Sequence, residues 1–327
     1  MKPNFARRFL VTLLMTAGLS ATVYGQTTFP SKPIRIVAPF AAGGAADTVA
    51  RIIGPKLSSA LGQPVVIENR AGAAGAIGSA YVASSSPDGH TLLMNLGPPH
   101  QTVNLFTKGV TYDPVKDFTA IAMVAAAPQA VAVPANSPIK SVTDLLIKAQ
   151  TEPKGLSYGT SGAGTSQHLA GLLLVSTKNA RLTHVPYRGG AAALTDVIAG
   201  QVDMGILVLS NLLPHAQSGK LRILGVVEGT RSNSAPNIPT LAESGIAGFS
   251  VPDTWVGLLG PAGMPQALVQ RLGIEMGKVM RDTEVVARMT QAGYDIKFSG
   301  PEEFNRQLVD SAALYKAITI QAGITPE

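Results

Sequence analysis

Residues 34–48 read Ile-Arg-Ile-Val-Ala-Pro-Phe-Ala-Ala-Gly-Gly-Ala-Ala-Asp-Thr, and several structural signals follow one another in this stretch. The apolar, β-branched run at 34–37 predicts a buried strand. Small residues around Gly43 and Gly44 predict a tight turn, and the apolar spacing after it predicts a helix over 47–61. Such a turn presents backbone N–H groups at the positive end of a helix dipole, which suits an anion.

The same succession of strand, glycine turn and helix occurs again further along the chain. Residues 156–158 predict a strand, residues 159–164 read Gly-Thr-Ser-Gly-Ala-Gly, and a helix is expected over 165–176. One glycine turn alone often does no more than permit a tight connection. A matched pair favours another interpretation, in which two anion-binding helix ends close on one acidic ligand.

Strand and helix signals alternate along most of the chain, which is typical of an α/β fold with helices on both faces of largely parallel sheets. Two sets of this alternation predict two doubly wound lobes. The apolar stretches 124–134 and 223–227 are expected to run between the lobes as a hinge, because their composition differs from that of a flexible linker. The further predicted strands are 65–68, 91–94, 183–185 and 204–207, and the further predicted helices are 75–83, 141–150, 191–199, 265–280, 283–292 and 301–322.

This order of elements predicts how the chain divides between the lobes. Residues 26–127 and 228–327 are expected to form a discontinuous first lobe, with the three C-terminal helices packed on it. Residues 128–227 are expected to form a second lobe inserted into the first. A cleft at the hinge follows from this topology.

Residues 1–25 are predicted to be a secretory signal peptide. Lys and Arg residues precede an apolar run over 9–19, and small residues up to Gly25 offer a cleavage site. The alternative is a membrane anchor, but the apolar run is shorter than the roughly 20 residues that span a bilayer. The mature chain is therefore expected to begin near Gln26 and to be periplasmic.

The composition excludes several classes of function. Only 14% of the residues are charged and Lys+Arg exceed Asp+Glu by only 26 to 20, so there is no dense basic footprint for nucleic acid. The absence of Cys excludes disulfides, thiolate metal sites and catalytic thiols. The five His residues form no metal-ligand pair, and neither glycine turn completes a P-loop or dinucleotide motif. We expect neither a metal nor a cofactor.

Some polar and aromatic residues allow two interpretations. His168, in the first turn of the second predicted helix, could reach a ligand or cap the turn. Tyr187 follows a strand end, where side chains line clefts in doubly wound sheets. Asp203 could bind a ligand ammonium or act as a turn acceptor. Trp255 could wall a pocket, although an aromatic beside an apolar strand more often lies in the core.

An enzyme is the alternative to a binding protein. Ser161 followed by His168 leaves a serine hydrolase formally possible, with Ser161 as the nucleophile. Residues 159–163 lack the last glycine of a nucleophile elbow, and a catalytic triad is recognised by geometry rather than by sequence order.

Short motifs follow one another along almost the whole mature chain. They are Pro33-Ile-Arg-Ile-Val-Ala-Pro-Phe40 with Gly43-Gly44, Val66-Ile-Glu-Asn-Arg70, Pro87-Asp-Gly89, Tyr112-Asp-Pro114, Tyr158-Gly-Thr-Ser-Gly162, Val185-Pro-Tyr187, Gly200-Gln-Val-Asp203, Gly219-Lys-Leu-Arg222, Pro239-Thr240, Pro261-Ala-Gly263 and Ala322-Gly-Ile324. In these motifs the sequence resembles the extracytoplasmic solute receptors of tripartite tricarboxylate transporters, the Bug-type receptors.

The resemblance implies a type II periplasmic binding protein, a Venus flytrap whose glycine turns hold a ligand carboxylate. It implies a non-catalytic receptor that delivers its cargo to the membrane permease subunits of an ion-gradient-driven transporter, and a monomer is expected. A receptor of an ATP-driven importer would share this fold and stays an alternative. The binding residues that it implies are Phe40, Ala42, Gly43, Gly44, Asp47, Ser161, Gly162, Thr165, Ser166, His168 and Asp203.

The chain departs from the family pattern in two places that concern the ligand. Ala42 stands where the first turn usually has Pro. Residues 96–100 read Leu-Gly-Pro-Pro-His, whereas this segment is more often rich in Ser, Asn and Thr. We expect the segment to lie at a strand end facing the cleft, so Gly97 and Pro98 are candidate contacts for the distal half of the ligand.

Overall fold

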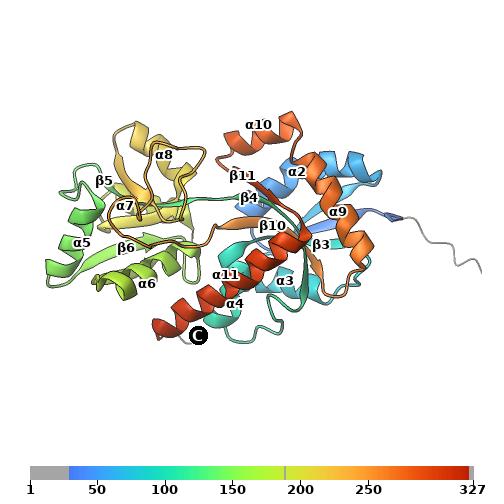
Figure 1. Ribbon diagram of the computed structural model, residues 1–327, viewed down its shortest axis with the longest axis horizontal. Coiled ribbons are helices and arrows are strands. Elements are labelled where there is room, and N and C mark those ends of the chain that lie inside the picture. Colours follow the sequence, from blue (N-terminus) through green and yellow to red (C-terminus); the bar gives the residue numbers. More distant parts are fainter. Residues whose placement is uncertain (1–28, 188, 324–327) are drawn as a thin grey trace, which may run out of the picture.

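The computed structural model describes residues 29–187 and 189–323, which form two α/β units lying side by side (Figure 1). The predicted signal peptide lies outside the described residues. The first unit has a sheet of six strands in the order β11 (Asp295–Ser299), β4 (Phe118–Ala126), β10 (Trp255–Pro261), β3 (Thr91–Leu96), β1 (Ile34–Ala38) and β2 (Val65–Asn69). The second unit has a sheet of five strands in the order β7 (Leu182–Pro186), β6 (Leu156–Thr160), β8 (Met204–Val208), β5 (Gln129–Pro134) and β9 (Leu221–Val226).

Both sheets are parallel in one half and antiparallel in the other. β1 pairs in parallel with β2 and β3, and β6 pairs in parallel with β7 and β8. β10 is antiparallel to β3 and β4, and β5 is antiparallel to β8 and β9. Within each parallel half the carboxyl ends of the strands share one edge, where the turns that precede the helices lie.

Each sheet carries a hydrophobic core on both faces, because successive strand residues point to opposite sides. Ile36 and Val37 of β1 lie in different cores, as do Val131 and Ala132 of β5. In the first unit, one core is covered by α2 (Ala45–Leu61), α9 (Gln266–Val279) and α10 (Thr283–Gln291). The other core is covered by α3 (Ala76–Ala83), α4 (Gly97–Phe106) and the start of α11 (Pro301–Gln321). The short 3₁₀ turn η1 (Ala73–Gly75) precedes α3. In the second unit, α5 (Val142–Thr151) and α6 (Ser166–Lys178) cover one core and α7 (Gly190–Ile198) and α8 (Leu209–Gln217) the other.

The predicted α/β class and the two doubly wound lobes are confirmed. The strands and helices expected in both units are present within a few residues of their predicted bounds. Strands β10 and β11 and helices α4 and α8 were not anticipated. α4 begins with Gly-Pro-Pro, which resembles a loop in sequence, although proline fits the first turn of a helix.

Two chain passages connect the units. The first leaves β4 after Ala126 and enters β5 at Gln129, as the predicted hinge stretch 124–134 required. The second runs through residues 251–254 into β10. The passages are hydrogen-bonded to each other, since the Ala127 N–H donates to the Thr254 carbonyl at 2.9 Å.

The expected return passage at 223–227 is wrong. Residues 223–226 belong to β9, at the edge of the second sheet, and the chain stays on the second unit as far as Val251. Leu241, Phe249 and Val251 pack into a core of the second unit. The apolar composition of 223–227 reflects a buried strand rather than a crossing.

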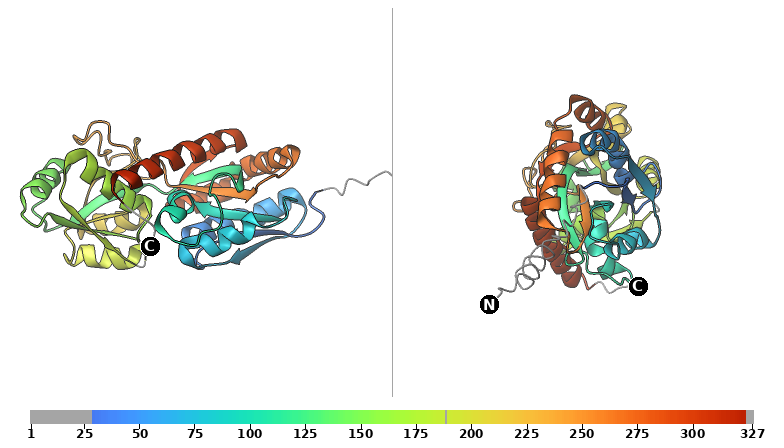
Figure 2. Two further views of the ribbon diagram at one scale, coloured as in Figure 1. Left: turned by 90° about the horizontal axis from the view of Figure 1, so that it is seen from below. Right: turned by 90° about the vertical axis from the view of Figure 1, so that its right-hand side faces the viewer.

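Helix α11 packs on both units. Phe304 and Leu308 lie in a core of the first unit, whereas Tyr315 and Ile318 lie in a core of the second. Figures 1 and 2 show this helix, in red, running along both units. The expectation that the three C-terminal helices pack on the first lobe therefore needs correction for the last turns of α11. None of the helices in the described part of the chain is long and apolar enough to cross a bilayer.

Candidate functional site

The first glycine turn connects β1 to α2, and its residues 41–43 are exposed. Gly43 has a φ of +79°, a conformation that favours glycine, and space for a Cβ is open there. Gly44 caps α2 without a side-chain hydrogen bond. The first N–H groups of α2 therefore point out of the helix end with no capping side chain over them.

Asp47 holds this turn in shape through hydrogen bonds. Its buried carboxylate accepts the Gly43 N–H at 2.9 Å on Oδ2, and the Arg51 Nε and Asn69 Nδ2 at 2.9 Å each on Oδ1. The bond from Arg51 is the main cause that holds the pKa of Asp47 below its usual value. Asn69 also donates to the Phe40 carbonyl at 3.2 Å. Asp47 and Asn69 thus position Phe40 and the turn, and Asp47 offers no free oxygen to a ligand.

The second glycine turn connects β6 to α6 and is capped by a hydroxyl. Thr165 is the N-cap, and its Oγ1 accepts the His168 N–H at 3.3 Å and donates to the Gly162 carbonyl at 2.8 Å. Gly162 has a φ of +138°, which residues other than glycine rarely adopt. Ser166, the first residue of α6, is buried.

His168 and His184 support the second turn from inside. Their rings stack with centroids 3.9 Å apart and an interplanar angle of 11°. His168 Nδ1 accepts the Gly164 N–H at 3.2 Å, and His184 Nε2 lies 2.7 Å from Thr160 Oγ1. Burial lowers the pKa of His168 to about 3 and that of His184 to about 4, so both rings are neutral at physiological pH. Of the two interpretations of His168, the structure favours the cap of the turn.

Ser161 directly follows β6 and lies beside polar groups from helices α6 and α8. Its N–H donates to Gln167 Oε1 at 2.6 Å. A Cβ built on Gly190 would lie 3.1 Å from Ser161 Oγ and 3.6 Å from Asn211 Nδ2, so the hydroxyl and the amide approach the same point. Sequence reasoning missed Gln167 and Asn211, because only the fold brings the starts of α6, α7 and α8 to one edge.

The arrangement around Ser161 differs from a catalytic triad. Within residues 29–187 and 189–323, no histidine is hydrogen-bonded to the Ser161 hydroxyl: His168 faces an amide and His184 faces Thr160. The described part of the chain also holds no group of three or more His, Asp or Glu residues that could bind a metal ion.

Tyr187 and Asp203 have structural partners. The Tyr187 hydroxyl donates to Asp196 Oδ2 at 2.7 Å, and its ring lies over Gly159. Asp203 accepts both the N–H and the hydroxyl of Ser157 at 2.7 Å, where β6 and β8 begin. The glycine turn lies at the other end of β6, so Asp203 is a turn acceptor at the opposite edge of the sheet.

Gly97 and Pro98 follow directly on β3, at the strand end where they were expected, and both are buried in the first turn of α4. A Cβ on Gly97 would come within 2.9 Å of the Trp255 indole nitrogen. The helix that they start reaches the second unit, because Thr102 Oγ1 lies 2.8 Å from the Gly164 carbonyl. Trp255 belongs to the core.

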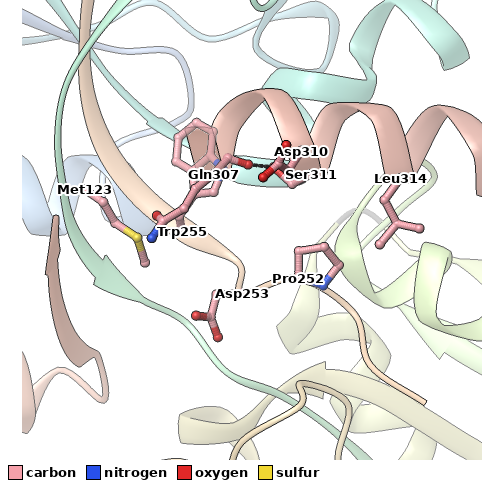
Figure 3. A pocket seen from close by; sticks show the side chains of 8 residues that line it. All are labelled: Met123, Pro252, Asp253, Trp255, Gln307, Asp310, Ser311 and Leu314. Carbon is pink, nitrogen blue, oxygen red and sulfur yellow. Dashed lines mark hydrogen bonds between the residues drawn. The ribbon is translucent and has the colours of Figure 1, made fainter. Parts of the chain in front are cut away.

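Two hollows lie near these elements. Gly43 and Thr48 line one of about 400 Å³ beside the first turn, together with Arg51 of α2 and Arg288 of α10. The other, of about 310 Å³, lies between the second chain passage and α11 and includes no residue of either glycine turn (Figure 3). Its lining residues are Met123, Pro252, Asp253, Trp255, Gln307, Asp310, Ser311 and Leu314.

The sequence matches the family described as tripartite tricarboxylate transporter family receptor over residues 49–324. The chain belongs to this receptor family. Among curated relatives, the UPF0065 protein in the tcbD-tcbE intergenic region of Pseudomonas sp. (strain P51) is 39% identical over 302 residues, covering 91% of this chain and 89% of that protein. The receptor is thus a periplasmic solute-binding protein by family, as the resemblance implied.

Solved structures agree with this assignment of the receptor. An R. palustris protein solved with adipate has a TM-score of 0.80 and 31% identity, covering 91% of this chain and 100% of its own. The periplasmic binding protein BugD has a TM-score of 0.76 and 30% identity, covering 91% and 100%. MatC from Rhodopseudomonas palustris, with bound malate, has a TM-score of 0.75 and 30% identity, covering 89% and 100%. The two-lobed periplasmic binding fold is confirmed.

Proposed function

We propose that this receptor captures a small dicarboxylate between its two lobes, with a carboxylate held at the glycine turns after β1 and β6. The observation that carries the proposal is the matched pair of helix starts, α2 and α6, each at the carboxyl end of a parallel strand. Adipate and malate, the acids present in two related structures, each carry two carboxylates.

The physical basis is the unpaired N–H groups of a helix start. Together with the helix dipole they bind a carboxylate without a formal cation. We assign the direct contacts to the exposed turn at Ala42, to the first amides of α2 after Gly44, to the Phe40 ring, and to the N-terminal amides of α6. The N–H groups of Gly43 and Gly44 are donated to Asp47 and to the Ala41 carbonyl, and they hold the first turn in shape. In the second turn the Ser161 hydroxyl and the backbone at Ser166 complete the contacts. The Thr165 hydroxyl and the Gly162 N–H are donated within the turn and hold it in shape.

The other predicted site residues have supporting roles in this proposal. Asp47 and His168 hold the two turns in shape, and Tyr187 holds the end of β7. Gly97 and Pro98 set the start of α4, which carries Thr102 to the second turn. Asn211 is the residue that we add, as a donor for the distal end of the ligand.

Lobe closure is the proposed signal of occupancy. Within the described residues, 29–127 and 252–323 form one lobe and 128–251 the other, with the end of α11 packed against the second lobe. A ligand that contacts both lobes stabilises the closed arrangement. The closed receptor, a non-catalytic monomer exported by residues 1–25, then delivers its cargo to the permease subunits of an ion-gradient-driven tripartite tricarboxylate transporter.

A thermal-shift screen of the ligand-stripped mature receptor tests the proposal. The panel comprises dicarboxylates, tricarboxylates, acidic amino acids and aromatic carboxylates, with neutral adipamide as the matched control for adipate. A ligand at about 100 times its Kd adds about 2.7 kcal/mol, which raises the Tm of a chain of this length by about 4 °C. We expect a dicarboxylate to give this rise and adipamide to give none. A folded receptor that responds to no carboxylate contradicts the proposal.

A further inference from the structure

A chain of buried side chains connects the hinge to the second glycine turn. Ser161 donates its N–H to Gln167 Oε1 at 2.6 Å, and Gln167 Nε2 donates to Gln129 Oε1 at 2.8 Å. Gln129 Nε2 then donates to the Ala127 carbonyl at 2.6 Å. Since the first partner can only donate and the last can only accept, the orientation of both side-chain amides is determined.

The hinge end of this chain is held by a carboxyl group. The backbone N–H of Gln129 donates to both oxygens of Glu228, at 2.9 and 3.1 Å, and the Gln129 carbonyl accepts the Val227 N–H at 3.0 Å. Glu228 is only 3% exposed. Both the N–H and the carbonyl of Gln129 are thus hydrogen-bonded. Gln129 is the first residue of β5, where the chain enters the second sheet, and it lies beside the second chain passage.

Glu228 has no cation as a direct partner in the described part of the chain. Burial raises its pKa to about 8; the charge of Asp253 acts in the same direction, and Lys297 acts against it. Lys297 is engaged by Asp253 at 2.8 Å. Tyr315 of α11 is the remaining titratable group close by, and its pKa is raised by burial and by the charges of Glu228 and Asp253. Burying a carboxyl group costs desolvation free energy, so we interpret Glu228 by the hydrogen bonds that it makes there.

We infer that Glu228 is a positioning residue for ligand binding, which fixes the second glycine turn through Gln129 and Gln167. The inference rests on the proposed function, in which the second turn holds the ligand carboxylate. The connection has two consequences. The orientation of the Ser161 amide depends on residues at the hinge as well as on helix α6. A substitution of Glu228 is therefore expected to affect the second glycine turn through buried hydrogen bonds and not through the surface of the lobe.

Hydrogen-exchange mass spectrometry on the ligand-free mature receptor tests the inference without any knowledge of the ligand. The readout is the peptide over 159–165, compared with a peptide over 204–208 from the core of the same lobe. Gln167→Met and Glu228→Ala are expected to speed exchange in 159–165 about tenfold, the effect of one lost hydrogen bond, with 204–208 unchanged. Glu228→Gln keeps a side-chain oxygen that accepts the Gln129 N–H, so exchange in 159–165 is expected to stay as slow as in the natural protein. Gln150→Met, at an exposed glutamine bonded to Lys178, is the matched control.

Three results would overturn the inference. One is unchanged exchange in 159–165 for Glu228→Ala. Another is an equal rise of the exchange rate in both peptides, which indicates general destabilisation. The third is exchange in 159–165 that is as fast in Glu228→Gln as in Glu228→Ala. Should Glu228→Ala fail to fold, Gln129→Met breaks the chain at its middle and is judged by the same two peptides. Because no ligand is present, failure here is distinct from failure of carboxylate binding in the thermal-shift screen.

Discussion

His168 and His184 make the second glycine turn sensitive to acid. Their rings stack at 3.9 Å inside the turn, and burial is the main cause that lowers both pKa values, to about 3 and about 4. Protonation would place two buried cations face to face. A proton on His168 Nδ1 would also abolish its bond from the Gly164 amide. The turn therefore depends on both rings being neutral.

The two histidines make the free energy of unfolding fall as the pH falls. A histidine whose folded pKa is below its unfolded value of about 6.5 contributes stability above that pH, and the contribution is lost as the pH falls toward the folded pKa. Between pH 6.5 and pH 5 the loss is about 2 kcal/mol for each histidine. Urea unfolding at pH 7 and pH 5 measures it. His184→Gln is expected to show a smaller loss than the natural protein, and equal losses in the two proteins would contradict this reading.

Helix α11, like α4, contacts both units outside the hinge. Ile318 is buried in the second core, whereas Ile320, on the same helix, is 66% exposed. Figure 2 shows the helix extending from the first unit onto the second. Helix bounds could be predicted from local periodicity and the Pro301 start, but the change of partner along the helix depends on how the two units are placed.

The matched pair of isoleucines tests this packing. Ile318→Ala is expected to destabilise the second unit by about 2–5 kcal/mol, because it removes buried methyl groups and leaves a cavity. Ile320→Ala is expected to change stability by less than about 0.5 kcal/mol. Hydrogen exchange in the strands of the second sheet measures both changes. Equal effects of the two substitutions would show that the end of α11 is not part of the second core.

At the scale of the whole molecule, the local backbone signals were predictable and the long-range contacts were not. Most of the strands and helices and both glycine turns follow from hydrophobic period and from glycine, which act over a few residues, whereas β10, β11, α4 and α8 were not anticipated. The role of Asp203 depends on which edge of a sheet it reaches, and the burial of Gly97 depends on Trp255, far away in sequence. The return passage was misplaced because a buried edge strand and a crossing have the same apolar composition.

In the proposed function the ligand binds at the glycine turns. α2 offers an internal comparison, because Gly43 precedes it and Gly62 follows it. Both have a positive φ, +79° and +73°, and open space where a Cβ would go. An aspartate at either position meets the same backbone strain, but only at position 43 does its charge stand at the proposed carboxylate site.

Titration calorimetry with the acid selected by the thermal-shift screen is the most direct measurement. Gly43→Asp is expected to weaken binding at least about tenfold, because like charges meet at the helix start, while Gly62→Asp stays within about twofold of the natural protein. Equal affinity of the two variants would contradict the account and place the ligand away from the first turn.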